Sequence, residues 1–293
     1  MRQNTLRVRL LGPVDLQLDN QPLPPLDSAR AESLLAYLLL HRDAPQPRQR
    51  LAFLLWPGSS EGQAQTNLRK VLHTLRRALP DADRLIEIGP RTLRWRPDAP
   101  LWLDVERFER AVADGRPAEA VGLYAGDLLE GRYDDWLAAE RERLAGLHAD
   151  ALQRLARQHE QDHRWPEAIR CAERLIARDP LREEYHRLLI GLCQASGDRA
   201  RAVRAYHVCA ATLEDELGIE PAPETRVLYE SLVAGAQADR ASPDRTSPGR
   251  ASRVPGTPPL VGRDDERARL AAAWQAAASG HPRLVLVRVV PGR

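Results

Sequence analysis

The chain has 293 residues, of which 43% are hydrophobic, and its formal net charge is +2. This length suits two domains with room for part of a third, and the apolar content supports ordered cores. No apolar run approaches the length of a membrane span, and the first twelve residues alternate like a strand instead of forming a signal-peptide core. These features argue against a membrane-spanning or secreted protein, so we expect a cytoplasmic protein with no membrane partner.

The charge is unevenly distributed along the chain. Basic residues are concentrated between Arg48 and Arg96. Acidic residues gather later, at Asp134-Asp135, Glu183-Glu184 and Glu214-Asp215-Glu216. A nucleic-acid-binding module joined to a neutral partner domain would show this asymmetry.

The N-terminal region is predicted to form a small sheet followed by a helix. Leu6–Leu11 is a compact apolar strand that Gly12-Pro13 interrupts, and Val14–Leu18 alternates as a half-buried strand. Ser28 can cap the helix that follows and runs to His41.

Two further helices come next. A short one is predicted over Arg48–Leu55, and a longer, arginine-rich one ends at Pro80. The longer helix carries one apolar stripe at steps of four, three and four residues: Leu68, Leu72, Leu75 and Leu79. The remaining surface of this helix between Thr66 and Arg77 offers cations and hydrogen-bonding groups but no carboxylate, a composition that suits base edges and phosphates.

A basic hairpin completes this region. Arg84–Ile88 and Thr92–Arg96 are predicted strands joined by the turn Gly89-Pro90. Strands, three helices and a hairpin, in that order, are typical of a winged helix-turn-helix.

The winged-helix interpretation assigns roles to individual residues, because the N-terminal half of the arginine-rich helix would enter the major groove. The expected readers of base edges are Gln65, Thr66, Arg69, Lys70 and His73. The residues better placed for phosphates are Asn67, Thr74, Arg76 and Arg77 on the same helix, and Arg48 on the helix before it. Arg91, Thr92 and Arg94 at the hairpin would contact the DNA backbone or minor groove. The alternative is an ordinary amphipathic helix with a solvated charged face.

Residues 101–234 are predicted to be helical and to contain a repeat. Trp165–Ile169 returns as Arg199–Val203, an offset of 34 residues, which is the tetratricopeptide period. The small residues Ala168 and Ala202 fall where paired helices would approach closely.

No catalytic or metal-binding motif is evident. The cysteines, Cys171, Cys193 and Cys209, share no metal-ligand spacing and suit buried positions on helices. His159 and His163 are four residues apart but lack a third ligand. We therefore expect no enzyme activity, no metal and no cofactor.

Four phrases carry a family resemblance. They are LLAYLLLHRDAPQPRQRLAFLLWP, QTNLRKVLHTLRRAL, LWLDVERFERAV and LEDELGIEPAPETRVLYESL. Together they resemble regulators that contain a bacterial transcriptional activator domain (BTAD), the group that includes the antibiotic regulatory proteins of actinomycetes. The resemblance covers about residues 5–234. It implies an OmpR-type winged helix that binds double-stranded promoter DNA, and a tetratricopeptide-like domain that forms a homodimer and contacts RNA polymerase.

The predicted fold class is mainly α with a small β component. A winged-helix DNA-binding domain is expected at residues 1–98, an all-α tetratricopeptide-like domain at 99–234 and a flexible linker at 235–259. Residues 260–293 resemble the start of the ATPase domain of larger regulators in this family. No lysine follows Lys70, so the lysine of a phosphate-binding loop is missing and we expect no ATP binding.

The predicted function is sequence-specific DNA binding by a transcriptional regulator, specifically an activator. Two alternatives stay open. The chain could be the N-terminal portion of a larger ATPase-type signalling regulator, or a tetratricopeptide interaction adaptor without DNA binding. The missing phosphate-binding lysine argues against the first, and the uninterrupted basic face of the arginine-rich helix argues against the second.

Overall fold

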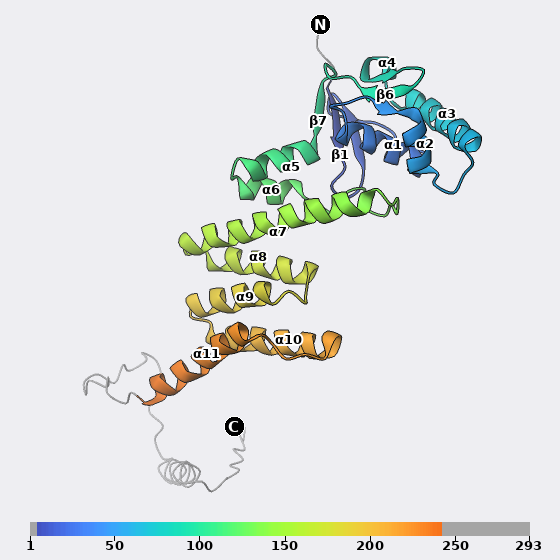
Figure 1. Cartoon of the computed structure of the whole chain (residues 1–293). Helices are drawn as coiled ribbons and strands as arrows, with labels where there is room; N and C mark the ends of the chain where they lie inside the picture. The colour runs from blue at the N-terminus through green and yellow to red at the C-terminus, as the bar shows by residue number, and fades with distance from the viewer. Residues whose placement is uncertain (1–4, 242–293) are drawn as a thin grey trace, which may run out of the picture. The chain divides into compact units, whose positions relative to one another are not determined.

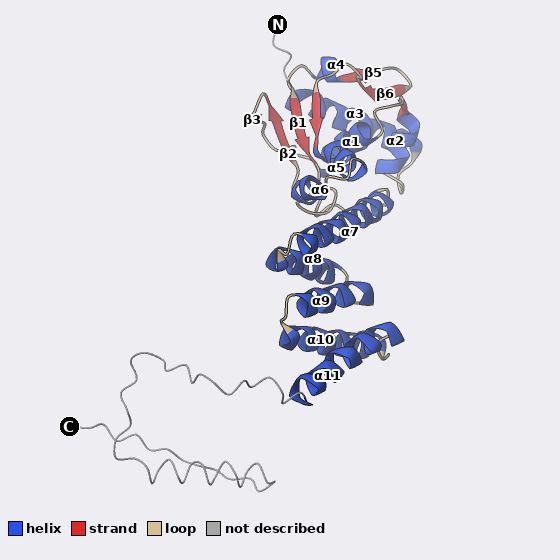
Figure 2. Cartoon of the chain, turned by 90° about the vertical axis from the view of Figure 1, so that its left-hand side faces the viewer, coloured by secondary structure: helices blue, strands red, loops and turns tan. Residues whose placement is uncertain are grey.

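The computed structural model describes residues 5–241, with side chains described up to residue 234 (Figure 1). Within this part the chain is mainly helical, and its strands all lie before residue 104 (Figure 2). The predicted fold class is therefore confirmed. The predicted ATPase-like segment at 260–293, and the predicted linker from residue 242 to 259, lie outside the described residues. The helix α11, Pro223–Ala241, extends beyond residue 234, where we expected the linker to begin.

The first sheet has four strands in the order β3-β2-β1-β7. The strands are β1 (Leu6–Arg9), β2 (Asp15–Leu18), β3 (Gln21–Pro22) and β7 (Leu101–Leu103). β7 pairs in parallel with β1, although it lies beyond residue 98, where the sequence predicts a domain boundary. The first sheet therefore joins the N-terminal region to the start of the helical region.

Three helices follow the first strands: α1 (Ala29–Leu40), α2 (Arg48–Leu55) and α3 (Glu61–Ala78). α2 has the predicted bounds. The four predicted stripe leucines of α3 are all 5% exposed or less, which confirms the stripe. Their burial against α1 and α2 fixes which face of α3 remains in solvent.

The second sheet has three strands in the order β4-β6-β5, where a two-stranded hairpin was predicted. They are β4 (Gln46–Pro47), β5 (Ile86–Ile88) and β6 (Thr92–Trp95). Residues 84 and 85 belong to a one-turn helix, α4 (Ala82–Leu85), so the prediction of a strand from Arg84 is wrong. Asp81 is the N-cap of α4 and has a left-handed backbone with a φ of 53°. The helical turn therefore begins before the strand does, and the strand starts only at Ile86. With β5 and β6 as its wing, the N-terminal region is a winged helix-turn-helix.

The helical region is a succession of antiparallel helices, of which the first six each pack on the next (Figure 1). The last helix contacts the one before it through the stacked rings of Tyr206 and Tyr229. They are α5 (Asp104–Ala113), α6 (Pro117–Leu123), α7 (Leu137–Gln161), α8 (Trp165–Arg178), α9 (Glu183–Ala195), α10 (Arg199–Leu217) and α11. Sequential helix hairpins of this kind are the tetratricopeptide arrangement.

The predicted 34-residue repeat corresponds to the starts of α8 and α10. A residue with positive φ lies two positions before each helix: His163 at 56° and Gly197 at 82°. Ala168 and Ala202 are fully buried at equivalent positions in the two helices. The repeat is therefore one helix-turn-helix unit, with a small residue at each close helix contact.

Replacing Ala202 with leucine should destabilise the protein by about 1–3 kcal/mol, because a larger side chain has no room at this helix contact. Ala200 lies on the same helix and is exposed, so Ala200→Leu is the matched control and should cost less than about 0.5 kcal/mol. Urea unfolding of the two variants measures the difference. Equal stabilities would show that the helices do not pack closely at Ala202.

The N-terminal and helical regions are joined by buried hydrogen bonds. The Asp104 side chain is only 2% exposed and accepts from the backbone N–H groups of Leu10 at 2.8 Å, Leu11 at 2.9 Å and Val105 at 2.8 Å. Burial raises the pKa of this carboxyl, and the three donors oppose the rise. Asp104 therefore ties the end of β1 to the start of α5.

A second set of contacts links α1 to the segment before α7. Arg132 donates to the buried Glu32 at 2.7 Å, and Arg30 pairs with Asp134. The Trp136 indole donates to Ser33 at 3.1 Å. Part of the acidic cluster seen in the sequence thus serves this internal contact.

His148 is a buried residue of α7. Its ring stacks on Tyr124 with centroids 4.2 Å apart, and its Nε2 lies 3.4 Å from Arg174 Nη2. Burial, together with the charges of Arg174 and Arg178, lowers the pKa of His148 to about 4. The folded protein therefore holds this imidazole neutral at pH 7.

Acidification should destabilise the protein through His148. Its pKa in the folded state is about 4, below the value of about 6.5 expected in the unfolded chain, so the unfolded state takes up the proton first. The stability contribution is complete above pH 6.5 and is lost as the pH falls toward 4. Between pH 7 and 5 the loss should be about 2 kcal/mol. Urea unfolding of the protein and of His148→Gln at both pH values measures it, and an unchanged pH dependence in the variant would contradict the assignment.

Candidate nucleic-acid interface

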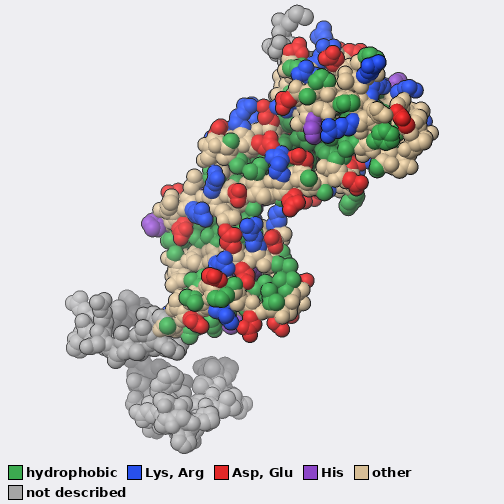
Figure 3. Space-filling view, viewed as in Figure 1, with side chains coloured by type: hydrophobic (Ala, Val, Ile, Leu, Met, Phe, Trp, Pro, Cys, Tyr) green, Lys and Arg blue, Asp and Glu red, His purple; other side chains and the backbone are tan. Residues whose placement is uncertain are grey.

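The face of α3 opposite its buried leucines is solvent-exposed. Thr66, Arg69, Lys70, His73, Arg76 and Arg77 are exposed, and Gln65, Asn67 and Thr74 are partly buried. In Figure 3, basic and histidine side chains are visible at the end of the molecule where Figure 1 places α3. All nine residues predicted on this helix are thus accessible to a ligand to some degree.

Three cationic side chains and one histidine on this face have no side-chain partner in the described part of the chain. Arg69, Lys70, His73 and Arg77 form no hydrogen bond or ion pair with any residue between 5 and 241 through their side chains. Arg76 differs, because its guanidinium pairs with Asp83 at 2.8 Å. Arg76 and Arg77 were both predicted to contact phosphates, but of these two only Arg77 has no carboxylate partner in the described structure.

The polar residues of α3 are held by local hydrogen bonds. Glu61 accepts from Gln65 at 3.1 Å and from Gln49 of α2 at 3.0 Å. The Thr66 and Thr74 hydroxyls donate to main-chain carbonyls four residues earlier in the helix. A hydroxyl that donates in this way has only lone pairs to offer, so Thr74 must rotate before it can donate to a phosphate.

Gln49 and Glu61 were missed in the sequence. The four-residue step from Glu61 to Gln65 was a usable signal for that hydrogen bond. The contact from Gln49 depends on how α2 packs on α3, and no local pattern reveals it.

The wing turn lies next to the start of α3. Arg48 donates through its side chain to the Gly89 carbonyl at 3.2 Å and through its backbone N–H to the Arg91 carbonyl at 2.9 Å. A hollow of about 610 Å³ between α2, α3 and this turn is lined by Arg48, Gln65, Arg69 and Arg91, among others. The structure therefore brings together predicted residues from three separate segments.

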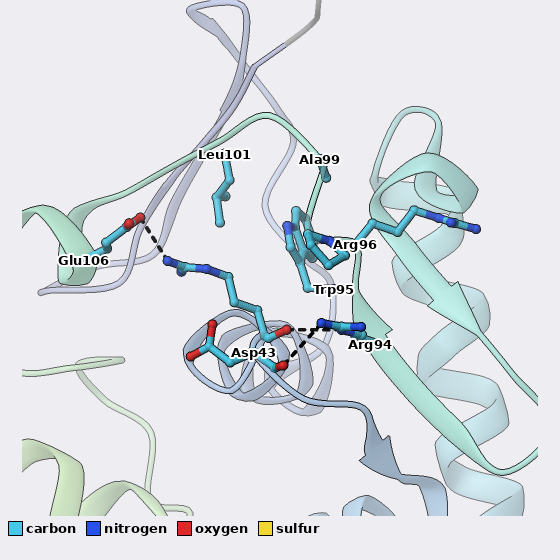
Figure 4. Close-up of a pocket in the computed structure, with 9 residues that line it drawn as sticks. Asp43, Arg94, Trp95, Arg96, Ala99, Leu101 and Glu106 are labelled. Atoms are coloured by element: carbon cyan, nitrogen blue, oxygen red, sulfur yellow. Dashed lines mark hydrogen bonds and ion pairs between the residues drawn. The ribbon is translucent and has the colours of Figure 1, made fainter.

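Arg94 does not join this group. Its guanidinium donates to the main-chain carbonyls of Arg42 at 3.4 Å and Asp43 at 3.2 Å, in a different cavity (Figure 4). Thr92 is partly buried and lies opposite Pro47 where β6 pairs with β4 in the second sheet. Of the three predicted hairpin residues, only Arg91 lies in the turn and is exposed.

The histidines and cysteines of the described chain form no metal site. In the part of the chain from 5 to 241, no three His, Cys, Asp or Glu side chains are arranged to hold a metal ion. The three cysteines are buried free thiols, and burial raises the pKa of each. No helix among the described residues has the length and apolar character needed to cross a membrane.

Comparison with known proteins agrees with this architecture. Residues 103–233 match the family model of the bacterial transcriptional activator domain. The transcriptional regulatory protein MoaR1 of Mycobacterium bovis is 28% identical over 247 residues, which is 78% of this chain and 79% of MoaR1. The regulatory protein AfsR of Streptomyces coelicolor is 27% identical over 250 residues, which is 80% of this chain but only 25% of AfsR.

A solved structure shows the same fold. Mycobacterium tuberculosis EmbR, in complex with a low affinity phosphopeptide, superposes with a TM-score of 0.61 at 22% identity, covering 95% of this chain and 73% of EmbR. The sequence relatives and the family model place the chain among the transcriptional regulators. Within that class, its helical region carries the match to the bacterial transcriptional activator domain, over residues 103–233. The family resemblance and the expectation of a non-enzymatic protein are thereby confirmed.

Proposed function

We propose that this chain binds promoter DNA sequence-specifically and activates transcription. The observation that carries the proposal is the row of exposed cations on α3 (Arg69, Lys70 and Arg77), which have no side-chain partner among the described residues and lie next to the hollow shared with the wing turn. In a winged helix the α3 equivalent enters the major groove, and the preceding helix and wing contact the flanking backbone.

Roles within this proposal follow from the contacts. Arg69, Lys70 and His73 face solvent, have no competing partner between residues 5 and 241, and would read base edges, as a guanidinium can by pairing with guanine. Arg77, Arg48 and Arg91 would contact phosphates. Gln65 can reach a base once its hydrogen bond to Glu61 is broken. The residues given smaller roles are Thr66, Asn67, Thr74, Arg76, Thr92 and Arg94, because their polar atoms are engaged within the protein or partly buried.

The helical region would supply the other functions. We propose that it forms a homodimer and presents a surface to RNA polymerase. Exposed apolar side chains in and beside its last helices support an interaction role, since Val208 is 57% and Val227 is 62% exposed. Action on chromosomal DNA would place the protein in the cytoplasm.

Capture of sheared genomic DNA on the purified protein at low and moderate salt, followed by sequencing, tests the proposal. A regulator should enrich a few sites that share a short motif and survive moderate salt. Uniform retention that disappears with salt would mean electrostatic binding alone. That result would refute sequence-specific recognition and favour the adaptor alternative.

A further inference from the structure

The hollow between α2, α3 and the wing turn is large enough to hold a small molecule. Its volume is about 610 Å³, inside the range of roughly 300–1,000 Å³ that is typical of small-molecule sites. One of its walls is Leu68, which is only 1% exposed and belongs to the buried stripe of α3. The hollow therefore reaches down to that stripe, whereas a DNA backbone lies across a surface.

The lining of this hollow is basic. Arg48 of α2, Arg69 of α3 and Arg91 of the wing turn contribute to it, and no aspartate or glutamate of the described chain does. Arg69 and Arg91 have no ion pair between residues 5 and 241, and the Arg48 side chain bonds only to the Gly89 carbonyl, at 3.2 Å. The fold thus brings three arginines from three separate segments to one concavity without neutralising them there.

One carboxylate lies beside the hollow without lining it. Glu61 Oε1 accepts from Gln49 at 3.0 Å and from Gln65 at 3.1 Å, and both of these amide side chains line the hollow. The charge of Glu61 offsets one of the three arginines, which leaves an excess of two positive charges. An anion that enters the hollow is therefore attracted to it.

The size of this excess selects among anions. A phosphate monoester carries a charge of about −1.5 to −2 at neutral pH and has three acceptor oxygens, so it can bond to more than one guanidinium. A carboxylate or a phosphodiester of the DNA backbone carries only one negative charge. Pro47 and Pro90 add apolar surface to the lining, which an organic body attached to the phosphate can contact.

We propose that this hollow binds a small molecule that carries a phosphate monoester. The phosphate oxygens would accept from Arg48, Arg69 and Arg91, and the organic body would lie against Pro47 and Pro90. Arg69 cannot hold this phosphate and a base edge at the same time, so the ligand and DNA would exclude each other. This exclusion rests on the proposed function, whereas the ligand site does not.

Calorimetry of the whole protein without DNA tests the ligand site. Ribose 5-phosphate, glycerol 3-phosphate and inorganic phosphate are each titrated at constant ionic strength, because added salt screens a non-specific attraction. At least one of the two esters should bind saturably, with one site per chain. Saturable binding by neither ester, with or without binding of inorganic phosphate, would overturn the proposal.

Matched arginine variants test where that ester binds. Arg48→Gln and Arg69→Gln should each weaken its binding about tenfold or more, because each removes a charge-assisted hydrogen bond. Arg50 is exposed on α2 and does not line the hollow, so Arg50→Gln should bind the ester normally. Arg48→Gln also removes a bond to the wing turn, so Arg69→Gln is the deciding variant. Equal affinity in Arg69→Gln and Arg50→Gln would overturn the proposal.

Fluorescence anisotropy with the preferred DNA site tests the exclusion. At ten times its dissociation constant, the ester should weaken DNA binding about tenfold at constant ionic strength, as expected for a competitor. Unchanged DNA affinity with the ester bound would refute the exclusion. If the protein prefers no DNA sequence, the proposed function fails and the exclusion with it, while calorimetry alone decides whether the ligand site exists.

Discussion

Asp104→Ala is expected to lower the free energy of unfolding by about 3 kcal/mol or more. The substitution leaves the N–H groups of Leu10, Leu11 and Val105 without their acceptor in a buried site. Each unsatisfied buried N–H costs about 1–3 kcal/mol unless water reaches it. The effect should exceed that of most single substitutions, because one side chain serves three donors at the junction of two regions.

Urea unfolding followed by circular dichroism measures this loss. Asp104→Asn keeps one acceptor oxygen, so its free energy of unfolding should lie between those of the native protein and Asp104→Ala. Asp150 is exposed on α7 and has no partner among the described residues, so Asp150→Ala should change stability by less than about 0.5 kcal/mol. If Asp104→Ala is no less stable than Asp150→Ala, the hydrogen bonds of Asp104 do not hold the junction.

Arg69→Ala is expected to weaken binding to the preferred DNA site by about 1–3 kcal/mol, which is roughly tenfold to more than a hundredfold in affinity. Its guanidinium lies at the hollow between α3 and the wing turn and has no competing carboxylate in the described structure. If it reads a guanine, its loss should also relax the preference at one base position. Fluorescence anisotropy with the selected site and with single-base variants measures both effects.

Two other arginines separate base reading from general electrostatics. Arg77→Ala should weaken binding to all sequences alike and reduce the slope of affinity against salt by about one unit, as expected for a phosphate contact. Arg107 on α5 is an exposed arginine away from α3, so Arg107→Ala should leave affinity close to normal. An unchanged base preference in Arg69→Ala would remove Arg69 from base recognition.

Much of this fold could be predicted from local patterns. The stripe at Leu68, Leu72, Leu75 and Leu79 fixed the buried face of α3, because apolar residues at helical spacing must lie on one side. The 34-residue offset located the equivalent starts of α8 and α10, because each start depends on the local sequence of one helix-turn-helix unit. Local sequence also placed the cations of the candidate interface, since a buried stripe leaves its opposite face in solvent.

Other features arise only when distant segments meet. β4 is two residues long and forms because the chain passes beside β6, so it has no periodic signal of its own. The pairing of β7 with β1 joins residues more than ninety positions apart. In the sequence, Asp104 is an ordinary acidic residue at the start of a helix. Its hydrogen bonds exist only because the fold brings the N–H groups of Leu10 and Leu11 to its carboxylate.

The sequence by itself determined the long helices, the repeat and the exposed basic face, because each depends on spacing within one segment. Only the tertiary structure decided which of those cations remain free. Arg76 meets Asp83, and Arg94 turns toward the carbonyls of Arg42 and Asp43, while Arg69 and Arg77 meet no partner in the described chain. Charge compensation depends on distances of a few ångströms between separate segments, and only the packed fold sets those distances.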